Sequence, residues 1–161
     1  MSSIVAKAAK ADTNMSQNTV KTTAKVVNVE MFTREDRTDV KIVLDAEAKL
    51  PSYTLDTTTG QYIATELNYF SIRREALTAQ LCNKCEDIAL YRATQESAFN
   101  KRQLAVILIG STIEVLSTPI AAGETDENGN VISEHDTVHR KIGGIKLSQR
   151  AATLIDNSFT L

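Results

Sequence analysis

Two short segments in the first third of the chain alternate between apolar and polar residues. Residues 25–32 (KVVNVEMF) place Val27, Val29 and Met31 at every second position, and residues 39–44 (DVKIVL) repeat the pattern. A period of two indicates a strand with one buried face. The polar residues 33–38 lie between the two segments, so the pattern predicts an antiparallel pair of strands joined by a turn.

The pattern is less regular in the middle of the chain. Residues 45–55 give no clear period, although Pro51 argues against a helix there. After a polar loop at residues 56–60, residues 62–72 (YIATELNYFSI) are rich in β-branched and aromatic side chains. Such a composition favours a strand, so we expect the third strand here.

One helix is expected in the segment that follows. Residues 87–99 carry Ile88 and Phe99 at roughly helical spacing, which predicts a helix whose ends the pattern does not fix. Residues 73–81 either extend the third strand or begin a helix, and residues 104–109 (LAVILI) are either a buried strand or the end of a helix. The pattern leaves both alternatives open.

A long hairpin is the clearest feature of the C-terminal half. Residues 112–116 (TIEVL) alternate, and residues 138–147 (VHRKIGGIKL) form the expected returning strand. Between them, Asn128-Gly129 is a strong turn signal, because this dipeptide readily adopts the positive φ angles of tight hairpins. Gly143-Gly144 predicts a bulge or a bend in the returning strand. Together these features predict a hairpin from residue 110 to residue 147.

The resulting order is β-β-β-α-β-β, which is the order of a five-stranded OB barrel. We therefore expect an all-β fold with one helix, an OB-fold domain at residues 24–148, and a C-terminal tail or short helix at residues 149–161. Residues 1–23 are rich in Ala, Lys, Ser and Thr and predict an N-terminal arm. Such an arm either embraces another subunit or touches DNA, or it is a plain flexible tail.

Composition adds limits to this picture. The chain has 161 residues, 42% of them hydrophobic, and a formal net charge of −2, so a single globular domain without a bulk cationic coat is expected. A local basic groove remains compatible with that charge. No apolar run approaches the ~18 residues that a membrane span needs, and no signal peptide is recognisable. The two cysteines lie too close together to staple a secreted fold, so a cytoplasmic location is expected.

Three stretches resemble the bacterial and phage single-stranded DNA-binding protein family. Residues 65–72 (TELNYFSI) resemble its third strand and residues 110–115 (GSTIEV) the start of its fourth. Residues 125–130 (TDENGN) and 136–138 (DTV) resemble the tip and the return of its long hairpin. The resemblance implies an OB barrel that binds single-stranded DNA during replication or recombination, and a homo-oligomer of phage or bacterial origin.

The chain also departs from that family. The family stacks bases on Trp or Phe, whereas this chain has no Trp, and Glu124 stands where an aromatic residue is expected. The family ends in an acidic tip closed by Pro-Phe, but residues 154–161 (LIDNSFTL) contain one acid and no Pro. The stretch 73–101 is longer than the family's helical connection. Recruitment of partner proteins by the tail is therefore not expected here.

Binding of a single strand requires flat side chains that stack on bases, each worth ~1–3 kcal/mol, and cations that line a groove. The candidate stacking residues are Phe32, Tyr53, Tyr62 and Tyr69, and the candidate phosphate contacts are Arg34, Arg37, Arg73, Arg74, Arg140, Lys141 and Lys146. Tyr69 and Phe70 are neighbours in a strand and point to opposite faces. We expect Tyr69 outside, because a phenol tolerates water. Alternatively both rings belong to the core or an interface.

Acidic residues limit where DNA is expected to bind. The hairpin tip carries five of them, Glu124, Asp126, Glu127, Glu134 and Asp136. Their charge would repel phosphates, so binding is expected on the barrel face and at the base of the hairpin, around Arg140 and Lys141. The alternative is that the charged side chains are ordinary solvated surface.

Two further motifs are candidates for a metal site. Cys82 and Cys85 form a C-x-x-C, and His135 and His139 form an H-x3-H, which together could build a tetrahedral zinc site. The favoured interpretation is that the cysteines are helix-cap or core residues and the histidines surface residues, so no metal and no cofactor is expected. No P-loop, G-x-G-x-x-G or G-x-S-x-G is present, so neither an enzyme nor a small-molecule substrate is expected.

Three function classes follow. The favoured one is a single-stranded DNA-binding protein that acts by base stacking and phosphate electrostatics. The second is a phage or mobile-element assembly protein that self-associates through its β-barrel without nucleic acid, which the arm, the low aromatic content and the acidic pI favour. The third is a small enzyme or metalloprotein.

Overall fold

A computed structural model describes residues 19–92 and 98–160 of the chain. Within these residues the protein is mostly β, with seven strands in two antiparallel sheets and four helices. The strands are β1 (Val20–Arg34), β2 (Arg37–Leu44), β3 (Leu50–Asp56), β4 (Gln61–Leu67), β5 (Tyr69–Arg73), β6 (Thr112–Ile120) and β7 (Thr137–Lys146). The helices are α2 (Arg74–Lys84), α3 (Glu86–Arg92), α4 (Lys101–Leu108) and α5 (Gln149–Thr160).

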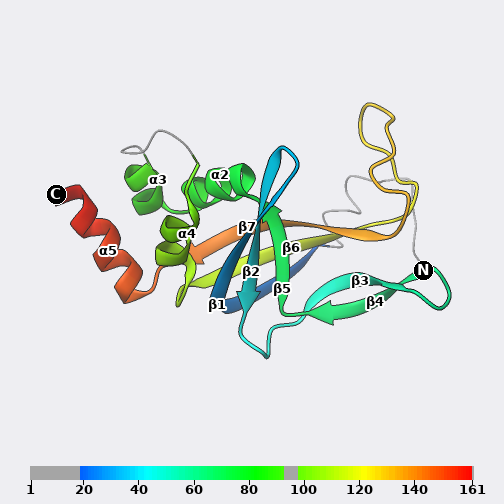
Figure 1. The fold of residues 1–161 in the computed structure, drawn as a ribbon, viewed down its shortest axis with the longest axis horizontal. Coiled ribbons are helices and arrows are strands. Elements are labelled where there is room, and N and C mark those ends of the chain that lie inside the picture. The colour runs from blue at the N-terminus through cyan, green and yellow to red at the C-terminus, as the bar shows by residue number, and fades with distance from the viewer. Residues whose placement is uncertain (1–18, 93–97, 161) are drawn as a thin grey trace.

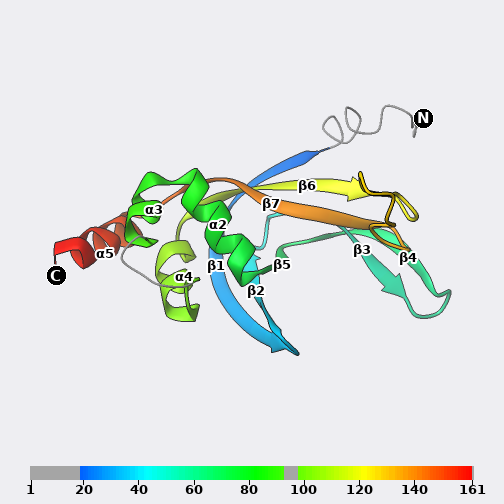
Figure 2. The same cartoon turned by 90° about the horizontal axis from the view of Figure 1, so that it is seen from above.

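The larger sheet has five strands in the order β5-β2-β1-β6-β7, and the smaller sheet pairs β3 with β4 (Figure 1). The helices lie towards one end of the molecule, and the β3–β4 hairpin and the β6–β7 loop lie at the other. The view from above shows the same separation (Figure 2).

Strand β1 belongs to both halves of the larger sheet. Its first half pairs with β6 from Val20 to Lys25, and its second half pairs with β2 from Val26 to Arg34. A register shift between Val26 and Asn28 lies at the junction. Val27 follows the buried Val26 and faces outwards, where it is 48% exposed, and the extra residue reverses the alternation after it so that Val29 is buried. The prediction that Val27 shares the buried face of Val29 is therefore wrong.

One face of the larger sheet forms the core. Its buried side chains are mostly branched aliphatics from β1, β2, β6 and β7, joined by Phe70 of β5. Helix α2 covers them with Leu77 and Leu81, and α4 with Leu104 and Ile107. Burial of each large apolar side chain stabilises the fold by ~1.5–3 kcal/mol. We call this buried side of the sheet the inner face and the opposite side the outer face.

The two edge strands of the larger sheet, β5 and β7, are bridged by a helix. Among the described residues no strand pairs with the free edge of either strand. Helix α2 packs against both strands, and Gln80 Oε1 accepts a hydrogen bond from the Ile142 backbone N–H at 2.8 Å. A side chain thus satisfies a backbone donor that a sixth strand would otherwise bond.

Local hydrogen bonds explain where two helices begin. Asn100 Oδ1 accepts from the Gln103 N–H and Gln103 Oε1 accepts from the Asn100 N–H, both at 2.9 Å, which is a capping box at the start of α4. Ser148 Oγ accepts from the Ala151 N–H at 3.0 Å at the start of α5. The Ser148 N–H donates to Ser111 Oγ at 3.0 Å, so the end of the hairpin is tied to its beginning.

The single strand predicted at residues 62–72 is two strands. β4 ends at Leu67 and β5 begins at Tyr69, and the two belong to different sheets. Between them, the Asn68 carbonyl accepts from the Leu44 N–H at 2.7 Å, and Asn68 Nδ2 donates to the Leu44 carbonyl at 3.1 Å. These bonds attach Asn68 to the end of β2, at the point where the chain stops pairing with β3. The stretch 62–72 is thereby divided between the two sheets.

The helix predicted at residues 87–99 is present in its first half as α3, but the expectation that it is the one helix and that it reaches Phe99 is wrong. α3 ends at Arg92, Phe99 is not helical, and residues 93–97 lie outside the described residues. Both open alternatives are resolved as helices, because α2 covers most of residues 73–81 and α4 most of residues 104–109. The C-terminal segment likewise forms α5, and β1 already begins at Val20, inside the segment assigned to the arm.

The long hairpin is present as predicted. β6 and β7 pair antiparallel, and Gly129 in the connecting loop has a φ of +82°. Asp126 Oδ1 accepts from the backbone N–H groups of Asn128 and Asn130, at 2.8 and 3.0 Å, and so holds the turn. The register shifts where Gly143 lies, which confirms the predicted bulge.

None of the helices among the described residues is both long and apolar enough to cross a membrane.

Candidate nucleic-acid interface

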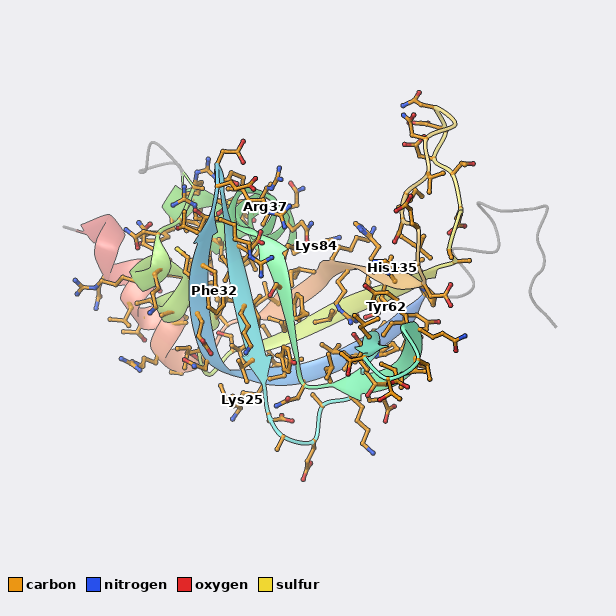
Figure 3. The ribbon with its side chains drawn as sticks, turned by 45° about the vertical axis from the view of Figure 1, so that its right-hand side comes forward. Lys25, Phe32, Arg37, Tyr62, Lys84 and His135 are labelled. Carbon is orange, nitrogen blue, oxygen red and sulfur yellow. The ribbon has the colours of Figure 1, made fainter. Side chains whose placement is uncertain are left out.

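The outer face of β1, β2 and β5 gathers aromatic and cationic side chains. We call this surface the aromatic face and define it by Phe32 and Arg34 of β1, Arg37 and Lys41 of β2, and Tyr69 and Arg73 of β5. The register places these residues on neighbouring rows, because Phe32 pairs with Asp39, which also pairs with Arg73, and Arg34 pairs with Arg37. Five of the six residues were predicted from the sequence as contacts. Figure 3 shows Phe32 and Arg37 on this wall of the molecule.

The two aromatic rings of this face are available to a ligand. Phe32 is 42% exposed and Tyr69 is 38% exposed, whereas Phe70 is 4% exposed in the core. Strand alternation therefore separates Tyr69 from Phe70 as the sequence predicts. Lys41 Nζ lies 4.4 Å from the centroid of the Tyr69 ring, which is within the range of a cation–π contact. Because the ammonium lies over the ring, a base that stacks on that side of Tyr69 would displace Lys41, whose cation could then contact a phosphate.

Charge on the aromatic face is mixed. Arg37 donates to Asp39 Oδ2 at 3.1 Å, and Asp39 is buried between its cross-strand neighbours Phe32 and Arg73. Glu30 shares the face, and Glu35 and Asp36 form the β1–β2 turn. The four cations of the face thus stand near four carboxylates. Binding here depends on stacking as well as on charge.

Tyr53 and Tyr62 lie in the other sheet. Tyr62 pairs with Leu55, and the Tyr53–Ala64 pair lies two positions further along the hairpin, so both tyrosines share one side of it. The Tyr62 ring stacks on His135 of the β6–β7 loop, with centroids 3.9 Å apart and planes at 7° (Figure 3). This spacing leaves no room for a base between the rings. The contact joins the β3–β4 hairpin to the β6–β7 loop.

Arg74 is the first residue of α2 rather than part of a strand face. Its guanidinium lies 3.5 Å from Glu75 Oε2, and its backbone carbonyl accepts from Thr78 Oγ1 at 2.9 Å. Arg74 is therefore adjacent to Arg73 in the sequence, but its side chain does not belong to the outer face of β5.

The base of the long hairpin divides its cations between two faces. Arg140 points to the inner face and donates to Ser117 Oγ at 2.8 Å, and burial lowers the pKa of its guanidinium from the usual value. Lys141 and Lys146 point outwards and are exposed. Adjacent residues in a strand face opposite ways, so Arg140 and Lys141 cannot contact one ligand from the same side.

Lys41 is the residue of the aromatic face that sequence reasoning missed. It alternates with Val40 and Ile42 in β2, so its outward direction was visible in the pattern. Its position beside Tyr69 depends on the pairing of β2 with β5, which the sequence does not specify.

Two acidic residues of the hairpin tip stabilise the loop, and the cysteines and histidines considered as zinc ligands do not form a cluster among the described residues. Asp126 holds the turn, and Asp136 Oδ1 accepts from the Ala122 N–H at 2.9 Å at the base of the loop. Cys82 and Cys85 are free and half-buried, and burial raises the pKa of the Cys82 thiol, an effect that Arg92 opposes in part. No cluster of three or more potential metal ligands occurs among residues 19–92 and 98–160.

No protein-family model, curated protein or solved structure matches this chain. Its function must be inferred from the geometry and chemistry of its own residues.

Proposed function

We propose that the protein binds single-stranded DNA on the aromatic face of an OB-type barrel, in support of replication or recombination. The observation that carries this proposal is that exposed rings and cations lie together on the outer face of β1, β2 and β5. One cation, Lys41, is in direct contact with one ring, Tyr69. Single-strand binding proteins use such stacking platforms beside cations.

The strand order supports the OB assignment. In an OB barrel a long, bent first strand pairs with the second and the fourth strands, and a helix lies between the third and the fourth. Here β1 pairs with β2 and β6, and the helices α2 to α4 lie between β5 and β6. The β3–β4 hairpin is then an insertion between the second and the third barrel strands. OB barrels are partly open, which is compatible with a gap that α2 and Gln80 fill.

The location of the aromatic face supports the same proposal. OB folds bind oligonucleotides on the face of their second and third strands, flanked by the loop between strands one and two. In this chain those strands correspond to β2 and β5, which carry Lys41, Tyr69 and Arg73. The Phe32 and Tyr69 rings would each stack on a base and contribute ~1–3 kcal/mol.

Oligo-dT binding measured by fluorescence anisotropy over a salt series tests the proposal. An oligonucleotide of about 16 nucleotides should bind, and log K should fall with log salt at about −0.7 for each phosphate contact. A duplex of the same length should bind less tightly, because its bases are already stacked. The Phe32→Ala/Tyr69→Ala variant should lose at least about 30-fold in affinity for oligo-dT. An unchanged anisotropy with oligo-dT at low salt would refute the proposal.

A second candidate is an assembly protein that self-associates without nucleic acid. The specific observation in its favour is the β3–β4 sheet, whose two strands each keep an outer edge with no partner strand among the described residues. Leu55 and Ile63 in this hairpin are exposed. Open edges beside apolar side chains can pair with another chain. Light scattering would favour this candidate if it showed a large ordered assembly in the absence of DNA.

A further inference from the structure

The outer face of β1, β6 and β7 is a second basic surface that the proposed stacking site does not use. The register aligns three strands here, so that Lys21, Leu116 and Lys141 form one row and Lys25, Thr112 and Lys146 form another. We call this surface the lysine face and define it by Lys21, Lys25, Lys141 and Lys146. All four lysines are exposed.

The lysines stand at the corners of a rectangle. Four residues separate Lys21 from Lys25 along β1, which corresponds to about 13 Å, and three strands span about 10 Å. Between the corners, Gly143 and Gly144 lack side chains, and the side chains of Leu116 and Glu114 from β6 lie over them, since a Cβ at Gly143 would be 2.8 Å from Leu116 Cγ and 3.0 Å from Glu114 Oε2. A shallow groove of about 620 Å³ begins at Leu116 and Lys141 and continues past Thr118 and His139. A chain lying along β6 would have lysines on both sides.

The charge balance differs from that of the aromatic face. Glu114 is the one carboxylate between the two rows, since it pairs with Thr23 and Gly144, and Lys21 Nζ lies 3.3 Å from its Oε1. No aromatic side chain lies on the two rows or lines the groove apart from the His139 imidazole. The acidic β6–β7 loop stands at the far end of the groove, where Ile120 and Ile132 line it. The surface therefore offers cations without stacking platforms, bounded by acids at one end.

We propose that the lysine face binds the sugar-phosphate backbone of a nucleic-acid strand, independently of its bases. The chemistry that it recognises is a linear polyanion, because ammonium groups in two parallel rows neutralise phosphates and release counterions without reading bases. The protein would then bind nucleic acid at two surfaces, with the aromatic face stacking on bases and the lysine face neutralising phosphates. Choosing DNA as the polyanion rests on the proposed function, but binding to a backbone is testable by itself.

The probe is a single strand of abasic deoxyribose phosphates, which has the charge of DNA but nothing to stack. The wild-type protein should bind this strand at low salt, measured by anisotropy. Lys141→Gln/Lys146→Gln should weaken binding about 20-fold at 0.1 M salt, because two phosphate contacts are lost. The matched control Lys49→Gln/Lys101→Gln removes the same charge from exposed positions elsewhere and should change affinity less than about threefold. Glu114→Gln should strengthen binding, since it removes the one carboxylate between the two rows of lysines.

The aromatic variant separates this inference from the proposed function. Phe32→Ala/Tyr69→Ala should bind the abasic strand as the wild type does, although it binds oligo-dT weakly. If Phe32→Ala/Tyr69→Ala instead keeps the wild-type affinity for oligo-dT, while abasic binding still depends on Lys141 and Lys146, the proposed function is refuted and this inference stands. The inference is wrong if the wild type does not bind the abasic strand at low salt. It is also wrong if Lys141→Gln/Lys146→Gln and the control Lys49→Gln/Lys101→Gln lose the same affinity for that strand.

Discussion

Strand β1 contributes its C-terminal half to the aromatic face and its N-terminal half to the lysine face, with the bulge at Val26 and Asn28 between them. The aromatic face sets two exposed rings among cations that are balanced by carboxylates. The lysine face has four ammonium groups, one carboxylate and no large ring. The same curved sheet can therefore offer two chemistries, because its partner strands differ on each side of the bulge.

The difference has a thermodynamic consequence. Stacking on the aromatic face depends on bases and is little affected by salt, whereas binding to the lysine face depends on phosphates and weakens steeply as salt rises. Base composition and ionic strength should thus separate the two surfaces experimentally.

The largest expected effect tests which ring of β5 faces inwards. Phe70→Ala should lower the free energy of unfolding by ~3–5 kcal/mol, because it removes a buried ring from the core. Tyr69→Ala should lower it by about 1 kcal/mol or less, since that ring is on the outer face. Urea denaturation followed by circular dichroism measures both. Equal losses would mean that the two faces of β5 are assigned incorrectly.

The next effect sharpens the role of the aromatic face. Tyr69→Ala should weaken oligo-dT binding by ~1–3 kcal/mol, whereas Tyr69→Phe should retain most of the affinity because the ring is kept. Leu90→Ala is a matched control, since Leu90 is 53% exposed on α3 and lies on neither face. Isothermal titration calorimetry gives the three affinities. A Tyr69→Phe loss as large as that of Tyr69→Ala would show that the hydroxyl, and not stacking, carries the contact.

A smaller effect concerns the close packing of Gly143 against Leu116 on the lysine face. A Cβ atom at Gly143 would lie 2.8 Å from Leu116 Cγ, so Gly143→Ala should destabilise the fold by ~1–3 kcal/mol through overpacking. In a Leu116→Ala background the same change should cost less, because the clashing atom is absent. Thermal unfolding of the four proteins measures the coupling. Additive costs would indicate that Gly143 is required for backbone conformation rather than for close packing.

The smallest effect concerns charge on the aromatic face. Asp39→Asn should free Arg37 and strengthen oligo-dT binding about threefold at low salt, with the gain shrinking as salt rises. Its cost in folding stability should be about 1 kcal/mol, because Asp39 is buried but its partner Arg37 is exposed to solvent, which weakens the ion pair. Anisotropy titrations at two salt concentrations measure the gain. Weaker binding by Asp39→Asn would mean that the carboxylate positions Arg37 for contact instead of competing for it.

Much of the hairpin and of the aromatic face could be predicted from local sequence. Asn128-Gly129 specifies its turn, Gly143 its bulge, and the alternation of Tyr69 with Phe70 assigns one ring to each face. These features depend on backbone preferences or on a period of two, both of which act within a few residues.

Other features depend on partners that the sequence does not reveal. Residues 62–72 read as one strand because their composition is continuous, and only the hydrogen bonds from Asn68 to Leu44 divide them between sheets. Residues 104–109 are compatible with a strand or a helix by composition. The Asn100–Gln103 capping box was the local signal that favours the helix. The lysine face depends on aligning β1, β6 and β7, which are far apart in sequence.

The most direct test of the central claim is to map oligo-dT contacts residue by residue with amide chemical-shift perturbation at moderate salt. If single-stranded DNA binds the aromatic face, the largest shifts should occur in the second half of β1, in β2 and in β5, around Phe32, Lys41 and Tyr69. Shifts confined to the β6–β7 loop or to the helices, with the aromatic face unaffected, would contradict it.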